Sequence, residues 1–179
     1  VRDLADVLVA SQETEPGDGW DYTALLSRLA TYTSMTAIDL GSAVVDTYGA
    51  FYGAQQGITL SGTRIAALGA LGDAIEAFAA TAIDAGIRAQ LVTAAQRATS
   101  IHGGDLDYRD LGDFMREIGD LLPGSATATQ AQQVISALDA AVFSQTSTVA
   151  GTAGLSVYLP LQGLQNDYEM LNFRFLEDT

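Results

Sequence analysis

Short apolar runs alternate with longer alanine-rich segments along this chain, and this alternation constrains the fold more than any other feature. The runs DVLVAS at 6–11, GITLSGTRI at 57–65 and LSVYL at 155–159 have the length of β-strands. Leu68–Asp84 and Ile87–Ile101 have the length and composition of helices. Strands interleaved with helices predict an α/β fold.

The first run, Asp6–Ser11, reads as a buried strand, so we expect a mostly parallel sheet flanked by helices. Apolar residues at helical spacing predict a helical insertion between Tyr22 and Ala54, with helices at Tyr22–Ala30 and Thr36–Ala54. The last strands follow one another closely, so parallel and antiparallel strands could be mixed at one edge of the sheet. The other expected elements are a helix tail at Val1–Ala5, helices at Tyr108–Leu121 and Leu164–Leu176, a helix ending at Ala141 that Thr127 or Thr129 would cap, and a strand at Val142–Val149.

Composition excludes several classes of function. The 179 residues suit one domain or a large part of one. The net charge is −14, which disfavours nucleic acid and anionic membranes and favours basic partners, although solubility explains it as well. No continuous apolar run has the ~18 residues of a membrane span. Without cysteine, the chain forms no disulfide, thiolate zinc site or cysteine nucleophile. With one histidine, it forms no two-histidine metal site.

The stretch Ser11–Tyr22, SQETEPGDGWDY, is the strongest functional candidate. It contains four acids, two glycines, a proline and the only tryptophan, and it has no basic residue. It follows a predicted strand, and ligands in open α/β sheets bind at the carboxyl ends of strands. Acids beside an aromatic ring suit an arginine or lysine side chain. The alternative is an acidic surface loop held in place by Trp20 and Tyr22.

Two other polar features have simpler explanations. The acids between Asp105 and Asp113 suggest a calcium loop, but they lack the EF-hand spacing, and acids at a helix N-terminus explain them. His102 has no recognisable nucleophile with it, so we interpret it as an exposed or helix-end residue rather than a general base. We therefore assign no catalytic or metal-binding residue to this chain.

Four segments occur here in one order: DVLVASQETEPGDGWDY, ITLSGTRIAAL, DYRDLGDF and GLSVYLP. Together they resemble the clostripain family of cysteine peptidases, which have a caspase-like α/β fold. The resemblance runs from Val1 almost to Thr179, and Ser11–Tyr22 is its most specific part. It implies a bacterial peptidase and a portion of a caspase-like three-layer sandwich.

In that family the catalytic histidine and cysteine both precede the region that matches here. The resemblance therefore implies that residues 1–179 are a single partial domain, the C-terminal part of a peptidase domain. Its partner would be an N-terminal segment or chain that carries the catalytic pair. The alternative is a catalytically inactive relative that binds basic peptides or acts as a scaffold.

Family members often cleave after arginine or lysine and use acids in the specificity pocket. The resemblance implies Asp18 as the favoured acid and Trp20 as part of the pocket wall. The weaker candidates are Glu13, Glu15 and Asp21. Some members depend on calcium, so no cofactor is expected apart from a calcium ion by analogy. Family analogy also implies secretion or the cell envelope, which the sequence itself leaves undetermined.

Overall fold

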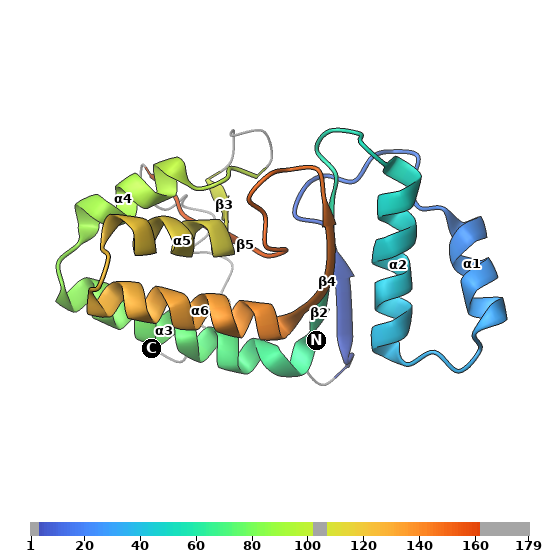
Figure 1. Cartoon of the computed structure of the whole chain (residues 1–179), viewed down its shortest axis with the longest axis horizontal. Helices are drawn as coiled ribbons and strands as arrows, with labels where there is room; N and C mark the ends of the chain where they lie inside the picture. Colours follow the sequence, from blue (N-terminus) through green and yellow to red (C-terminus); the bar gives the residue numbers. More distant parts are fainter. Residues whose placement is uncertain (1–3, 102–106, 162–179) are drawn as a thin grey trace.

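The structure is a computed structural model that describes residues 4–101 and 107–161. Helices dominate it, and the strands are short (Figure 1). In chain order the elements are β1 (Val7–Ala10), α1 (Tyr22–Thr31), α2 (Ala37–Tyr52), β2 (Thr59–Arg64), a 3-10 turn η1 (Ile65–Ala67), α3 (Leu68–Asp84), α4 (Arg88–Arg97), β3 (Tyr108–Asp110), α5 (Leu111–Leu121), α6 (Ala126–Ala141), β4 (Val142–Ser147) and β5 (Ser156–Tyr158).

The main sheet has three strands in the order β1-β2-β4. Both pairings are antiparallel, with Leu8 opposite Thr63 and Leu60 opposite Thr146. The short strands β3 and β5 form a second antiparallel pair. The prediction of an α/β chain is thus confirmed, but the prediction of a mostly parallel sheet is not confirmed by the described strands.

The helical insertion explains why β2 runs antiparallel to β1. Helix α1 leaves the end of the sheet at which β1 finishes, and α2 returns the chain to that same end (Figure 1). A single crossover helix would instead carry the chain to the opposite end and permit a parallel strand. Two helices in a row therefore oblige β2 to run back along β1.

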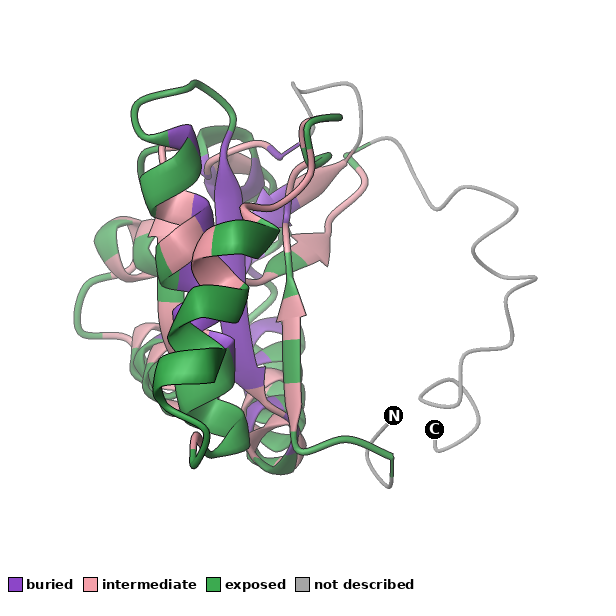
Figure 2. Cartoon of the chain, turned by 90° about the vertical axis from the view of Figure 1, so that its right-hand side faces the viewer, coloured by how far each residue is buried: buried purple, intermediate pink, exposed green. Residues whose placement is uncertain are grey.

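Helices cover the sheet from two sides. In Figure 1, α2 packs on one side of the sheet with α1 outside it, and α3 to α6 lie on the other side. Figure 2 looks onto the α1 side, where α1 is largely exposed and the central strand behind it is buried. Two separate apolar clusters result. One joins α2 to the sheet through Val45, Tyr48 and Leu60, and the other fills the space between α3, α4, α5 and α6.

Glycines on β2 and α2 leave room for the aromatic and β-branched side chains of β4 to pack against their backbones. A Cβ on Gly62 would lie 2.5 Å from Cζ of Phe143, and one on Gly49 would lie 2.5 Å from Oγ1 of Thr146. Gly62 also lies at an irregularity of its strand, because the register of β2 against β4 shifts between Gly62 and Thr63. Gly49 allows α2 to lie close against β4.

Several predicted boundaries were wrong for local reasons. Ser125, and not Thr127 or Thr129, caps α6, since its hydroxyl accepts from the amide of Ala128 at 3.0 Å. Tyr108 begins a strand, because its segment pairs with β5 before α5 starts.

The remaining differences concern chain ends and edges. Helix α4 stops at Arg97, and Ser100 forms an isolated bridge with Arg109. β1 is only partly buried, because it is an edge strand of the described sheet and Leu8 is 43% exposed. Of the expected first helix, residues 4–5 are not helical and 1–3 lie outside the described residues, as do the predicted helix Leu164–Leu176 and His102.

One segment of the described residues, Ile65–Asp84, is long and apolar enough to cross a membrane by length and composition alone. This is weak evidence for a span, because core helices of soluble proteins pass the same test. The segment carries Asp73 and Glu76, and it packs against α6 through buried residues such as Leu71 and Phe78.

We predict that Ile118→Ala destabilises the protein by about 2–5 kcal/mol, because Ile118 is 0% exposed at the centre of the helical cluster. Urea unfolding followed by circular dichroism measures this change. Ile83→Ala is the matched control, since Ile83 is 77% exposed. Equal losses of stability in the two variants would contradict the assignment of the core.

Candidate functional site

The acidic segment Ser11–Tyr22 forms a loop between the end of β1 and the start of α1. A tight turn closes its outer part, where the amide of Gly19 donates to the carbonyl of Pro16 at 3.1 Å. Asp18 lies in this turn and is exposed. Among the described residues, no hydrogen bond or ion pair engages the Asp18 carboxylate, so this carboxylate is available to an external cation.

One side chain of β2 holds the beginning of the loop. The Thr59 hydroxyl lies 2.8 Å from the hydroxyl of Ser11, and it accepts from the backbone amides of Gln12 and Glu13, both at 3.0 Å. Thr59 is itself buried. The chain leaving β1 is therefore bound to the central strand of the sheet before the acidic turn begins.

Helix α2 holds the end of the loop. The hydroxyl of Tyr52 donates to the carbonyl of Gly19. Trp20 packs against the cluster that contains Tyr48 and Tyr52, and its Nε1 donates to the carboxylate of Glu15 at 2.7 Å. In the surface-loop alternative, both Trp20 and Tyr22 hold the segment in place. The contacts of Trp20 agree with that alternative, whereas Tyr22 does not pack inward, because it is 61% exposed.

The other acids of the loop differ from Asp18 in what they contact. Asp21 caps α1, because its carboxylate accepts from the amide of Ala24 at 2.9 Å. Glu15 accepts from Trp20, and Glu13 lies half-buried at the base of the loop near Thr59. The structure thus brings Glu13, Asp18, Trp20 and Asp21 into one loop, in which Asp18 and Glu15 are exposed and Glu15 is engaged by Trp20.

The carboxylates of this loop influence the tyrosines beneath it. Burial raises the pKa of Tyr48 to about 12, and the negative charge of Glu15 contributes to this rise. Burial also raises the pKa of Tyr52, with further contributions from the charges of Asp18 and Glu15. Both phenols are therefore neutral at physiological pH.

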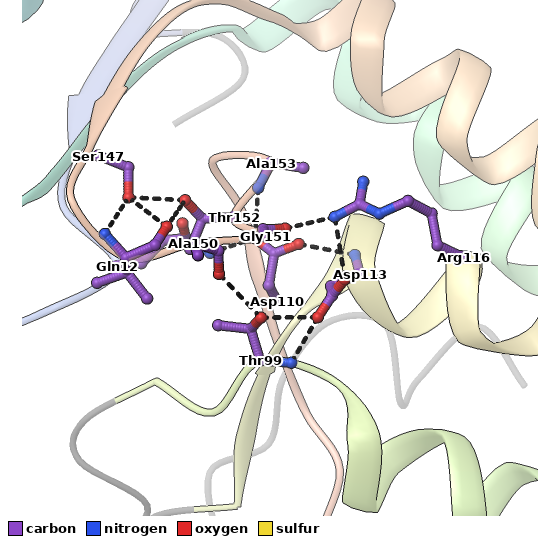
Figure 3. Close-up of polar contacts among 11 residues, drawn as sticks. Gln12, Thr99, Asp110, Asp113, Arg116, Ser147, Ala150, Gly151, Thr152 and Ala153 are labelled. Carbon is purple, nitrogen blue, oxygen red and sulfur yellow. Dashed lines mark hydrogen bonds and ion pairs between the residues drawn. The ribbon is translucent and has the colours of Figure 1, made fainter.

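Sequence reasoning missed a buried polar contact at the base of the loop. The side-chain amide of Gln12 donates to Oδ2 of Asp110 at 3.0 Å, and both residues are buried (Figure 3). These residues are 98 positions apart. No local pattern links positions so distant, and the only signal was an acid in the first turn of the predicted helix Tyr108–Leu121.

The second acidic segment is structural where it is described. Asp110 caps α5 by accepting from the amide of Asp113, and Asp113 accepts from Thr99 and Arg116. This agrees with the interpretation of these acids as helix N-terminal residues. In residues 4–101 and 107–161, no group of three or more histidine, cysteine, aspartate or glutamate side chains could hold a metal ion.

Comparison with known proteins identifies the family. The family model of the clostripain family, Peptidase_C11, matches residues 1–176. The chain belongs to the clostripain family. No curated protein matches this clostripain-family chain significantly.

Two solved structures are similar to this clostripain-family chain. One is an inactive zymogen C11 protease from Parabacteroides distasonis, with 16% identity and a TM-score of 0.58 over 99% of this chain and 51% of that one. The other is a secreted C11 cysteine protease from Bacteroides thetaiotaomicron in complex with an irreversible peptide inhibitor. It has 15% identity and a TM-score of 0.61 over 98% of this chain and 53% of that one. The chain thus shares their fold and spans about half of their length.

We predict that the protein loses stability as pH rises from about 10 toward about 12, and that Tyr48→Phe reduces this loss. The folded pKa of Tyr48 lies above its ordinary value, so the unfolded chain releases its proton first and unfolding is favoured in this range. Urea unfolding at a series of pH values measures the effect. Tyr32→Phe is the control, because Tyr32 is 62% exposed. Identical pH profiles for Tyr48→Phe and wild type would contradict the assignment.

Proposed function

We propose that this chain is the C-terminal part of a clostripain-like cysteine endopeptidase domain and supplies sheet strands and part of a pocket for arginine or lysine. Asp18 is the acid that binds the basic side chain, and Trp20 forms part of the pocket wall. The observation that carries this proposal is the accessible carboxylate of Asp18 in a family member, on a loop that is held at both ends.

The chemistry of the loop supports recognition of a cation. A carboxylate accepts charge-assisted hydrogen bonds from a guanidinium, and no described basic side chain competes for that of Asp18. Trp20 lies two residues away, where an aromatic face adds cation–π attraction. Asp21 and Glu15 already accept hydrogen bonds, and Glu13 lies deeper, so we assign these three acids to the negative field around the pocket.

The nucleophile of the complete enzyme has to come from outside these residues, because the chain has no cysteine. We propose that a segment or chain N-terminal to Val1 carries the catalytic cysteine and histidine. There the thiolate attacks the peptide carbonyl with the assistance of the histidine. Two observations support such a partner: the similar structures are about twice as long, and β1 is an edge strand of the described sheet.

We extend two family properties to this protein as proposals. The similar protease from Bacteroides thetaiotaomicron is a secreted one, which supports a location outside the cytoplasm. A calcium requirement stays a prediction of the family resemblance alone. Loss of activity in a chelator, restored by added calcium, would be the sign of such a requirement.

The residues that precede Val1 in the gene provide a first test. We predict a cysteine within about two to four helical turns of Val1 and a histidine at the end of an earlier strand. Replacing that cysteine with alanine abolishes cleavage of an arginine substrate in activity assays. A family match in which either residue is replaced would contradict the peptidase proposal, and it would favour a module that binds basic peptides.

The pocket has its own test in the complete protein. We predict that Asp18→Asn raises the KM for an arginine substrate by at least about tenfold, because the guanidinium loses its charged partner. Steady-state kinetics on a fluorogenic peptide measures the change. Asp84→Asn is the matched control, since it removes an equal charge from an exposed residue at the end of α3. An unchanged preference for arginine in Asp18→Asn would remove Asp18 from the pocket.

A further inference from the structure

Among the described residues, Asp110 is the buried acid, and its carboxylate accepts a network of hydrogen bonds. Its side chain is 0% exposed. Oδ2 accepts from the side-chain amide of Gln12 at 3.0 Å and from the backbone amide of Ala153 at 2.7 Å, and Oδ1 accepts from the amide of Asp113 at 2.8 Å (Figure 3). A buried carboxylate needs such donors, because it has lost its hydration.

These three donors come from segments that are far apart in the sequence. Gln12 follows β1 in the sheet, Ala153 belongs to the connection between β4 and β5, and Asp113 lies in the first turn of α5. The Ser61 hydroxyl, on β2, adds a buried bond to the carbonyl of Gly154 at 2.7 Å. Asp110 therefore joins the sheet to the helical cluster at the level where the acidic loop starts.

Gln12 is the link between this carboxylate and the acidic loop. Its side chain is held by Asp110, and its backbone amide is held by Thr59 at 3.0 Å. The next residue, Glu13, also donates its amide to Thr59. With both its side chain and its backbone fixed, Gln12 sets the direction in which the chain leaves β1 toward Asp18.

We propose that Gln12 and Asp110 are positioning residues that fix the acidic loop against the helical cluster, so that its outer turn is presented in one orientation. The part of this inference that concerns arginine recognition rests on the proposed function. The part that concerns the position of the loop does not. Neither residue contacts the substrate; they act through the loop backbone.

Gln12→Glu tests the link directly, because it replaces a donor with a second carboxylate beside Oδ2 of Asp110. Two carboxylates at hydrogen-bond distance do not both ionise readily. Lower pH favours a pair that shares a proton and keeps a hydrogen bond, whereas higher pH favours repulsion, which displaces the loop. Three charged residues lie close to this pair in the sequence. Asp113 binds Thr99 and Arg116, and Arg109 donates to the carbonyl of Ala95. Glu13 follows Gln12 directly and is half-buried, so its charge adds to the repulsion.

Hydrogen exchange in the complete protein measures the position of the loop without requiring any activity. In Gln12→Glu at about pH 8, we expect peptides that cover residues 13–21 to exchange at least about fivefold faster than in wild type, and we expect this difference to vanish at about pH 5. In the same variant at about pH 8, the KM for an arginine substrate rises about tenfold while kcat changes less than about twofold.

Two further variants serve as controls. Gln12→Met removes the donor without adding charge, so its smaller increase in exchange should be the same at both pH values, and it keeps a buried side chain of similar length. Gln133→Glu makes the same chemical change at an exposed position of α6 and should leave the loop unchanged.

The outcomes separate this inference from the proposed function. Faster exchange of residues 13–21 that reverses at acid pH supports the positioning role, whether or not the complete protein cleaves a peptide. If the complete protein cleaves no peptide, that result contradicts the proposed function but not the positioning role. Wild-type exchange of residues 13–21 in both Gln12 variants would overturn the positioning role.

Discussion

The buried carboxylate of Asp110 is the interaction on which the arrangement of this molecule most depends. The sheet and the helical cluster have largely separate apolar cores, and Val142 of β4 is an apolar contact between them. Asp110 accepts hydrogen bonds from Gln12 on one side and from Ala153 and Asp113 on the other. Because an unpaired buried carboxylate is costly, this geometry has few alternatives, and the two parts are held in one register.

The position of the acidic loop depends on this arrangement. Thr59 and Asp110 fix its start, Tyr52 fixes its end, and Trp20 packs against the cluster of α2. A loop held at both ends loses less conformational entropy when a ligand binds. Less of the electrostatic binding free energy is therefore spent on ordering the loop. The fold thus presents an accessible carboxylate at the end of β1 on a supported backbone.

Local sequence patterns predicted most helices and strands, and the helix Leu68–Asp84 was predicted with its observed bounds. Strand direction could not be predicted from a short apolar run, because it depends on the pair of helices that separates β1 from β2. The acidic loop was found from its composition and its place after a strand. The contact between Gln12 and Asp110 could not be found, since it joins residues 98 positions apart and no local pattern pairs them.

The central claim is that a clostripain-family peptidase recognises a basic side chain through the loop Ser11–Tyr22. A crystal structure of the complete protein, with a peptide inhibitor that ends in arginine bound covalently to the catalytic cysteine, tests this claim most directly. The account predicts that the arginine guanidinium lies within about 3 Å of the Asp18 carboxylate. A guanidinium bound by other acids, with this loop outside the pocket, would contradict it.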